Sequence, residues 1–206
     1  MMEFTSRAHD LLWLDRDTSL EGITANWVTE QWHCGLPVVV RRDVNQQGRI
    51  PVGVRGATRA QRAAGWVDPR HVIRVVTPQQ LARPQRLDAS PFAGLPPVRA
   101  ARQLADIAWP WAWGITGSTG YALATGVAVL HSDSDLDLTI HAPQPLDTAL
   151  LRTWQEQVAG LPCRADTQLE TPCGAIALNE WLRDGRGLLK TNQGPRLVVS
   201  PWDLED

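Results

Sequence analysis

The stretch Trp113-Gly-Ile-Thr-Gly-Ser-Thr-Gly-Tyr-Ala-Leu-Ala-Thr-Gly126, followed by Ser132-Asp-Ser-Asp-Leu-Asp-Leu-Thr-Ile140, carries the most structural information in this sequence. Its first half contains three glycines spaced three residues apart, which allow a backbone to approach a ligand closely. Ser118 provides a hydroxyl and an N–H group at a predicted helix N-terminus, where free N–H groups and the helix dipole attract phosphate. Gly117 and Ser118 are therefore predicted phosphate-binding residues.

The second half of the stretch contains two acidic residues in a predicted strand. Asp135 and Asp137 are two residues apart, so a strand places both carboxylates on one face and the intervening leucine on the other. Carboxylates held side by side repel each other, and a cation removes this repulsion. Mg²⁺ takes oxygen ligands and usually shares its shell with substrate phosphates. Asp135 and Asp137 are thus predicted Mg²⁺ ligands, whereas Asp133 is expected to be a loop residue or to lie at the edge of the metal site rather than to be a principal ligand.

Each half alone is a weak signal. An Asp-x-Asp pair occurs at many solvated strand ends, and the glycine turn matches neither the dinucleotide fingerprint nor the P-loop, because no Lys follows it. On consecutive elements, however, the two halves favour metal-dependent transfer of a nucleotidyl-like group to a hydroxyl.

Composition excludes several other classes of protein. The 206 residues carry a formal charge of −2, which is not typical of a general nucleic-acid binder. No apolar run is long enough for a membrane helix, and the first residues do not resemble a secretory signal, so we expect a cytoplasmic protein without a membrane partner. The three cysteines, Cys34, Cys163 and Cys173, fit neither a disulfide framework nor a zinc site. Cys34 follows His33, but a packed thiol is the preferred interpretation.

Charge is distributed unevenly along the chain. Residues 41–86 contain ten Arg and two Asp, whereas residues 130–206 contain twelve acidic and six basic residues. Arg suits bidentate contacts with phosphate. This polarity is consistent with a polyanionic ligand between a basic N-terminal part and an acidic, metal-binding C-terminal part, although solvated surface explains some of the arginines equally well.

The N-terminal part is predicted to be a small α+β unit of two to four strands, at residues 36–42, 49–56 and 71–76. Residues 58–64 are predicted to form a short helix that places Arg59 and Arg62 on one face. Arg55 ends the preceding strand. These three arginines are a candidate clamp for a triphosphate or a CoA phosphate, and solvent-exposed surface is the open alternative.

A proline-rich segment at residues 82–97 predicts a linker or a long surface connection, which divides the chain into domains at residues 1–88 and 89–206. Beyond it, the pattern predicts a helix at 98–107, a strand through Trp109, Trp111 and Trp113, and helices at 146–159 and 174–183. A strand at 162–170 and a hairpin at 188–199 complete this part. Lys190 in the hairpin is a candidate phosphate contact.

Three motifs resemble one family: Trp113-Gly-x-x-Gly-Ser-x-Gly, Leu123-Ala-Thr-Gly126 and Ser134-Asp-Leu-Asp-Leu138. They resemble the phosphoribosyl-dephospho-CoA transferases, the holo-acyl-carrier-protein synthases of malonate decarboxylase, within the polymerase-β-like nucleotidyltransferases. The gap from Ser118 to Asp135 is longer than is common in that superfamily, which favours this branch. The resemblance implies an α+β fold, with a polymerase-β-like nucleotidyltransferase C-terminal domain and a small α+β N-terminal domain.

The resemblance also implies a third carboxylate on a neighbouring strand, where it binds metal or accepts a proton. Asp166 and Glu170 are both candidates, because they lie on one face of the strand at 162–170. Asp166 is the first choice and Glu170 the second. The implied substrate is 2′-(5-triphosphoribosyl)-3′-dephospho-CoA, and the implied acceptor is a serine of the apo acyl carrier protein of malonate decarboxylase, with release of pyrophosphate. Two alternatives remain open: a small-molecule nucleotidyltransferase that uses ATP, and a catalytically silent module that binds nucleotide or carrier protein.

Overall fold

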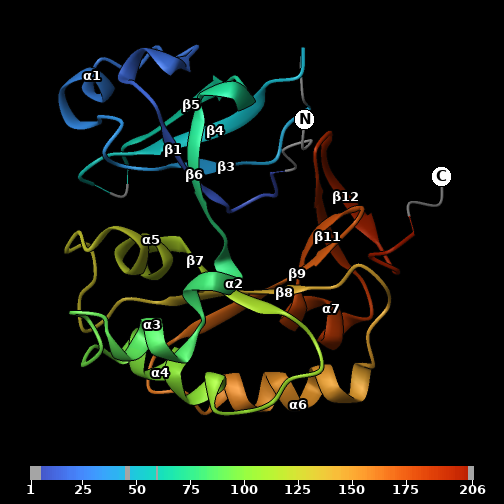
Figure 1. The fold of residues 1–206 in the computed structure, drawn as a ribbon. Helices are drawn as coiled ribbons and strands as arrows, with labels where there is room; N and C mark the ends of the chain where they lie inside the picture. Colours follow the sequence, from blue (N-terminus) through green and yellow to red (C-terminus); the bar gives the residue numbers. More distant parts are fainter. Residues whose placement is uncertain (1–5, 45–46, 59, 204–206) are drawn as a thin grey trace. The chain divides into compact units, whose positions relative to one another are not determined.

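The computed structural model describes residues 6–44, 47–58 and 60–203, and the chain divides into two compact units, Met1–Thr77 and Pro78–Asp206. Each unit contains its own six-stranded sheet with helices, and Figure 1 labels these elements along the ribbon. The combination of mostly antiparallel sheets with separate helices confirms the expected α+β class.

The division between the units lies N-terminal to the predicted boundary at residue 88. The proline-rich segment is not a linker, because its prolines occupy the first turns of two helices, and Pro78 begins a third just before it, at positions where the missing N–H group costs nothing. These helices are α2 (Pro78–Leu81), α3 (Pro84–Asp88) and α4 (Pro96–Ala105), and all belong to the second unit. The side chains of Leu81 and Leu87 are buried, which anchors α2 and α3 there.

The first unit is an antiparallel sheet in the order β2-β5-β4-β3-β1-β6. It has more strands than the sequence predicted, although the three predicted strands are present. Its elements are β1 (Leu11–Leu14), β2 (Leu20–Glu21), α1 (Trp27–Gln31), β3 (Val38–Val40), β4 (Ile50–Arg55), β5 (Arg62–Val67) and β6 (Val72–Val76), with short 3₁₀ turns at Asp17–Ser19 and Pro69–His71. One face packs the core between the sheet and α1.

The predicted helix at residues 58–64 is wrong, because the chain turns back there and forms β5. The N–H group of Gly56 donates to the carbonyl of Gln61 over 2.9 Å, and the Gln61 side chain accepts from the N–H and hydroxyl of Thr58. Arg62 then pairs with Arg55 across the hairpin. Pairing with β4, a tertiary contact, outweighs the helix propensity of this alanine-containing stretch.

The second unit has the strand order β12-β11-β10-β9-β8-β7, in which only β8 and β9 among the described pairs run parallel. Its elements after α4 are β7 (Trp113–Thr116), α5 (Gly117–Thr125), β8 (Leu136–His141), α6 (Thr148–Ala159), β9 (Ala165–Thr171), β10 (Gly174–Ala177), α7 (Leu178–Asp184), β11 (Gly187–Thr191) and β12 (Gly194–Val198). In Figure 1, α4, α6 and α7 lie on one side of this sheet and α5 on the other.

Most of the predicted elements of this unit are present, with two corrections. The helix predicted from residue 174 begins at Leu178, because residues 174–177 form β10. Only Trp113 of the alternating tryptophans belongs to a strand. The rings of Trp109, Trp111 and Trp113 instead pack around Trp154 of α6, with centroids 4.8–6.4 Å away. The alternation therefore reflects one aromatic cluster rather than a longer strand.

The centre of this cluster is joined to the sheet by a hydrogen bond. Trp154 has no exposed surface, and its Nε1 donates to the hydroxyl of Thr167 on β9 over 3.0 Å. Since neighbouring residues of a strand point to opposite faces, Thr167 faces α6 and Asp166 faces the other side. The bond fixes the orientation of β9 on the core.

Replacing Thr167 with Val keeps the volume but removes the acceptor of the Trp154 N–H group. We expect the free energy of unfolding to fall by about 1–3 kcal/mol, because a buried donor is left without a partner. Urea denaturation measures this loss. Adding Trp154→Phe to Thr167→Val should cost less than the sum of the two single losses, since the donor is then absent as well. Additive losses would contradict a direct bond between the two side chains.

Candidate active site

The strand β7 continues directly into α5, and this junction lies against the start of β8. Thr116 pairs with Asp137 across the two strands. At Gly117 the backbone has a φ of 62°, and a Cβ atom placed there would lie 1.9 Å from Oδ2 of Asp137. Only glycine fits both the conformation and the space. The glycine turn therefore makes room for the Asp137 carboxylate at the N-terminus of α5.

Asp135 lies just before β8, and the first turn of α5 holds its backbone. The hydroxyl of Thr119, which has no exposed surface, donates to the carbonyl of Asp135 over 3.3 Å. Ser118 precedes Thr119 in the same turn and is half-buried. Thr119 is a positioning residue that the sequence analysis missed. Its position within the Gly-Ser-Thr-Gly turn, next to Ser118, could have indicated this role in the sequence.

The parallel pairing of β8 and β9 separates the two candidates for a third carboxylate. Asp166 pairs directly with Asp137, whereas Glu170 pairs with His141, four residues further along. A parallel strand advances about 3.3 Å per residue, so Glu170 lies about 13 Å from the level of the carboxylate pair. Since paired residues project from the same face of a sheet, Asp166 is the lateral neighbour of Asp137.

Arg164 is the second residue that the sequence analysis missed. Its guanidinium lies 3.4 Å from a carboxylate oxygen of Asp166, and both side chains are more than half exposed. An exposed ion pair of this kind contributes little to stability. Arg164 and Asp166 are two residues apart, so the alternation of residues 162–170 could have predicted that they lie on the same face.

A divalent cation such as Mg²⁺ requires oxygen ligands from carboxylates, water or phosphate. Within residues 6–44, 47–58 and 60–203, no three His, Cys, Asp or Glu side chains form a group that could hold a metal ion. Asp137 and Asp166 are nevertheless two adjacent, exposed carboxylates on paired strands. Mg²⁺ sites commonly use one or two carboxylates and complete the shell with water and substrate phosphates. The paired carboxylates fit this kind of site.

Two cysteines have thiols whose pKa is raised. Burial raises the pKa of the Cys163 thiol, and the charge of Asp135 raises it further. A hydrogen bond with Asp17 raises the pKa of the Cys34 thiol. The thiolate is the nucleophilic form, so a raised pKa disfavours both residues as nucleophiles. This agrees with the interpretation of Cys34 as a packed thiol.

Among the predicted arginines, Arg55 and Arg62 are neighbours, but across a hairpin rather than along a strand and helix. Arg55 is half-buried and Arg62 is exposed. Arg59 lies outside the described residues. Like charges directly opposite each other on two strands are unfavourable, and an anion between them relieves the repulsion. The hairpin thus brings together two of the three candidate residues for a phosphate clamp.

Lys190 lies on β11 and is exposed. It pairs with Ala175 of β10, which in turn pairs with Glu170 of β9. Lys190 is therefore level with Glu170, and the sheet does not bring it beside Asp137 and Asp166. A role for Lys190 in phosphate binding stays a prediction.

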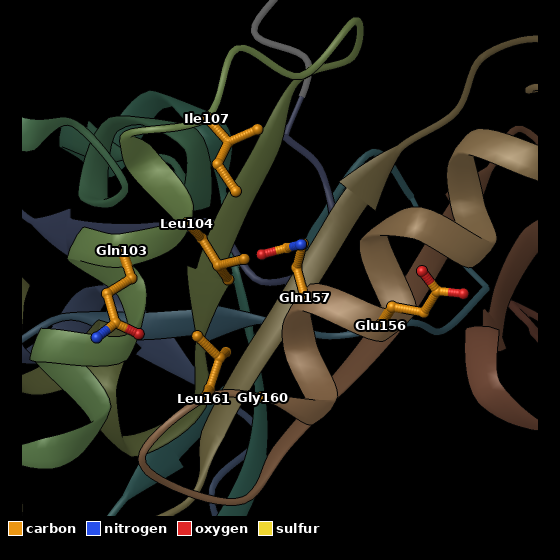
Figure 2. A pocket seen from close by; sticks show the side chains of 7 residues that line it. All are labelled: Gln103, Leu104, Ile107, Glu156, Gln157, Gly160 and Leu161. Atoms are coloured by element: carbon orange, nitrogen blue, oxygen red, sulfur yellow. The ribbon is translucent and has the colours of Figure 1, made fainter.

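A hollow of about 260 Å³ lies between α4 and α6 (Figure 2). Its lining consists of Gln103, Leu104, Ile107, Glu156, Gln157, Gly160 and Leu161. None of these is a predicted site residue. Because α6 packs on the face of β9 that carries Thr167, the hollow lies on the opposite side of the sheet from Asp166. The carboxylates of Asp137 and Asp166 are exposed and do not line this hollow.

Comparisons with known proteins cover nearly the whole chain. Residues 7–78 match the phosphoribosyl-dephospho-CoA transferase MdcG N-terminal domain, and residues 80–201 match the MdcG C-terminal domain. Several relatives carry the name phosphoribosyl-dephospho-CoA transferase. The relative from Klebsiella pneumoniae (strain 342) is 60% identical over 205 residues, which is 100% of both chains. The relative from Pseudomonas putida (strain GB-1) is 41% identical over 203 residues, which is 97% of both chains.

No solved structure matches this chain. Among the described residues, every helix is too short or too polar to span a membrane.

The contact between Gly117 and Asp137 predicts different effects for two glycines of α5. Gly126 also has a positive φ, of 75°, but a Cβ atom there meets open space. Gly117→Ala and Gly126→Ala should each lose about 1–2 kcal/mol of unfolding free energy from backbone strain. Only Gly117→Ala should also displace the Asp137 carboxylate and abolish turnover. Denaturation and activity measured on both variants provide the test, and equal activities would contradict a catalytic role for this contact.

Proposed function

The chain belongs to the phosphoribosyl-dephospho-CoA transferase family and is an enzyme of the transferase class, and we propose that it attaches the prosthetic group to the acyl carrier protein of malonate decarboxylase. In this proposal the enzyme transfers the phosphoribosyl-dephospho-CoA part of 2′-(5-triphosphoribosyl)-3′-dephospho-CoA to a serine of the apo carrier and releases pyrophosphate. The observation that supports it most is the pairing of Asp137 with Asp166 beside the N-terminus of α5.

The proposed reaction exchanges one phosphorus–oxygen bond for another. The serine oxygen forms a bond to the α-phosphorus of the precursor, and the bond from that phosphorus to the bridging oxygen of the leaving pyrophosphate breaks. The serine proton leaves to a nearby base. Such reactions need positioning and neutralisation of charge more than covalent participation by the protein.

Asp137 and Asp166, together with Asp135 at the start of β8, are the proposed ligands of Mg²⁺. When bound, the metal neutralises the triphosphate and stabilises charge on the attacking and leaving oxygens. Asp137 and Asp166 are held on paired strands, which limits their movement relative to each other. Asp166 is the carboxylate best placed either to complete the metal shell or to accept the serine proton.

The first turn of α5 is the proposed site for the leaving pyrophosphate. Thr116 at its N-cap makes no side-chain capping hydrogen bond. The first N–H groups of a helix lack partners within the helix and attract anions together with the helix dipole. Ser118 adds a hydroxyl at this turn. Arg164, beside Asp166, is a further cation within reach of the phosphates.

Arg55 and Arg62 of the first unit are proposed to bind further phosphate groups of the precursor. Cross-strand arginines present two guanidinium groups side by side, which suits contacts with an anion. An ATP-dependent nucleotidyltransferase for a small alcohol would use the same carboxylates, so the acceptor and precursor must be tested directly. Mass spectrometry of the apo carrier, incubated with enzyme, Mg²⁺ and the precursor, shows whether the whole prosthetic group is attached.

The same assay distinguishes the roles of the carboxylates. Asp137→Asn and Asp166→Ala should lose nearly all transfer, whereas Glu170→Ala should retain most of it, because Glu170 lies four residues from the level of the pair. The folds should persist, since removing one of several like charges relieves repulsion. Circular dichroism provides that control. If Asp166→Ala is fully active and Glu170→Ala is inactive, Glu170 rather than Asp166 is the third carboxylate of the site.

Calorimetry of precursor binding tests the arginine pair. Arg62→Ala should weaken affinity by roughly 1.5–3 kcal/mol if its guanidinium forms a charge-assisted bond to phosphate. Arg70→Ala is the matched control, because Arg70 is also an exposed arginine of the first unit but pairs with Asp68 over 2.7 Å. Equal affinities of the two folded variants would assign Arg62 to the solvated surface.

A further inference from the structure

The β11–β12 hairpin exposes a group of apolar side chains. Leu188 pairs with Leu197 across the hairpin, so both project from the same face, and Val199 follows directly after the end of β12. Their exposed fractions are 44%, 65% and 73%. Single exposed apolar residues are ordinary, but three neighbouring ones are typical of an interaction site. We call this surface, made of Leu188, Leu197 and Val199, the hairpin face.

Lys190 lies on the same side of the hairpin as Leu188, whereas Arg196 pairs with the buried Leu189 and projects from the opposite side. Residues 185–202 contain three basic residues, Arg186, Lys190 and Arg196, and no acidic residue. This is half of the basic residues found between 130 and 206, a region that is otherwise dominated by acidic side chains. A partner with exposed apolar residues next to Asp or Glu complements such a surface in both respects.

The hairpin face also lies on the same side of the sheet as the carboxylates. The pairing of Ala175 with Lys190 places Leu188 beside Ala177, two residues along, and Ala177 pairs with Gln168. Gln168 is two residues from Asp166 on the same strand face. With strands about 4.8 Å apart, the leucines lie roughly 12–16 Å from Asp166. This separation is within the footprint of one protein–protein interface.

We propose that the hairpin face is the docking surface for the acceptor protein, which binds through apolar side chains flanked by acidic ones and thereby presents its hydroxyl at Asp137 and Asp166. This inference rests on the proposed function and adds the partner's binding site to it. A hydroxyl on a folded protein can reach Asp137 and Asp166, because both side chains are exposed.

Addition of a strand from a second copy of this chain is the main competing use of the hairpin. β12 lies at the edge of the sheet, but it is five residues long and contains Pro195. Proline and short length are features that discourage pairing at an edge strand. The side-chain face is therefore the better candidate for contact than the backbone edge.

The test compares Leu188→Ser/Leu197→Ser with Leu150→Ser. Leu150 on α6 is similarly exposed, at 42%, but lies on a helix that covers the other side of the sheet. In transfer assays the hairpin variant should raise the KM for apo carrier about tenfold or more, with kcat and the KM for precursor nearly unchanged. Leu150→Ser should behave as the unaltered enzyme. An unchanged KM for carrier in the folded hairpin variant would overturn the proposal.

Calorimetry of carrier binding without precursor separates this proposal from the proposed function. The docking proposal is supported if the unaltered enzyme binds the carrier, if salt weakens this binding, and if the hairpin variant does not bind. This holds even if no transfer is detected, and in that case only the proposed function fails. If the unaltered enzyme and the hairpin variant modify the carrier equally well, the docking proposal is overturned and the proposed function is not. A change in the sedimentation of the hairpin variant, with unchanged carrier binding, assigns the face to self-association and also overturns docking.

Discussion

The candidate site depends on the parallel pairing of β8 with β9. In a parallel pair, residues of equal level project from the same face, so the register that aligns Leu136 with Ala165 also places Asp137 beside Asp166. A parallel connection requires a crossover, and α6 provides it. The bond from Trp154 of α6 to Thr167 then holds β9 to the core. A shift of one residue would turn Asp166 into the core.

The junction of β7 with α5 adds a second constraint to the same site. Gly117 has to lack a side chain because the Asp137 carboxylate occupies that space, and Thr119 bonds the backbone of Asp135. The helix N-terminus and the carboxylates are therefore positioned by contacts with each other. This arrangement places an anion-attracting helix end next to potential cation ligands, which is what transfer of a phosphate-containing group requires.

Local patterns in the sequence predicted the parts of the structure that depend on local physics. The helix after Gly117, the strand after Asp135 and the C-terminal hairpin follow from capping, periodicity and turn residues. Features that depend on distant pairing were not accessible in this way. Residues 62–67 form a strand because β4 lies alongside, and periodicity alone leaves Asp166 and Glu170 equivalent until the register with β8 is known. The proline-rich segment was misinterpreted because proline is common both in linkers and at helix starts.

The two faces of the second sheet differ in a way that bears on the kind of acceptor. One face is covered by α4, α6 and α7 and contains the buried leucines and Trp154. α5 covers part of the other face, which also carries Asp137, Asp166 and the exposed leucines of the hairpin. A small alcohol is usually bound in a pocket that surrounds most of its surface, since only such burial compensates for the entropy lost on binding. A serine on a folded protein needs no such pocket, because contacts made elsewhere on the carrier provide the binding energy. The exposed side chains of Leu188 and Leu197, which project from the same face as Asp137 and Asp166, therefore support the proposed protein acceptor.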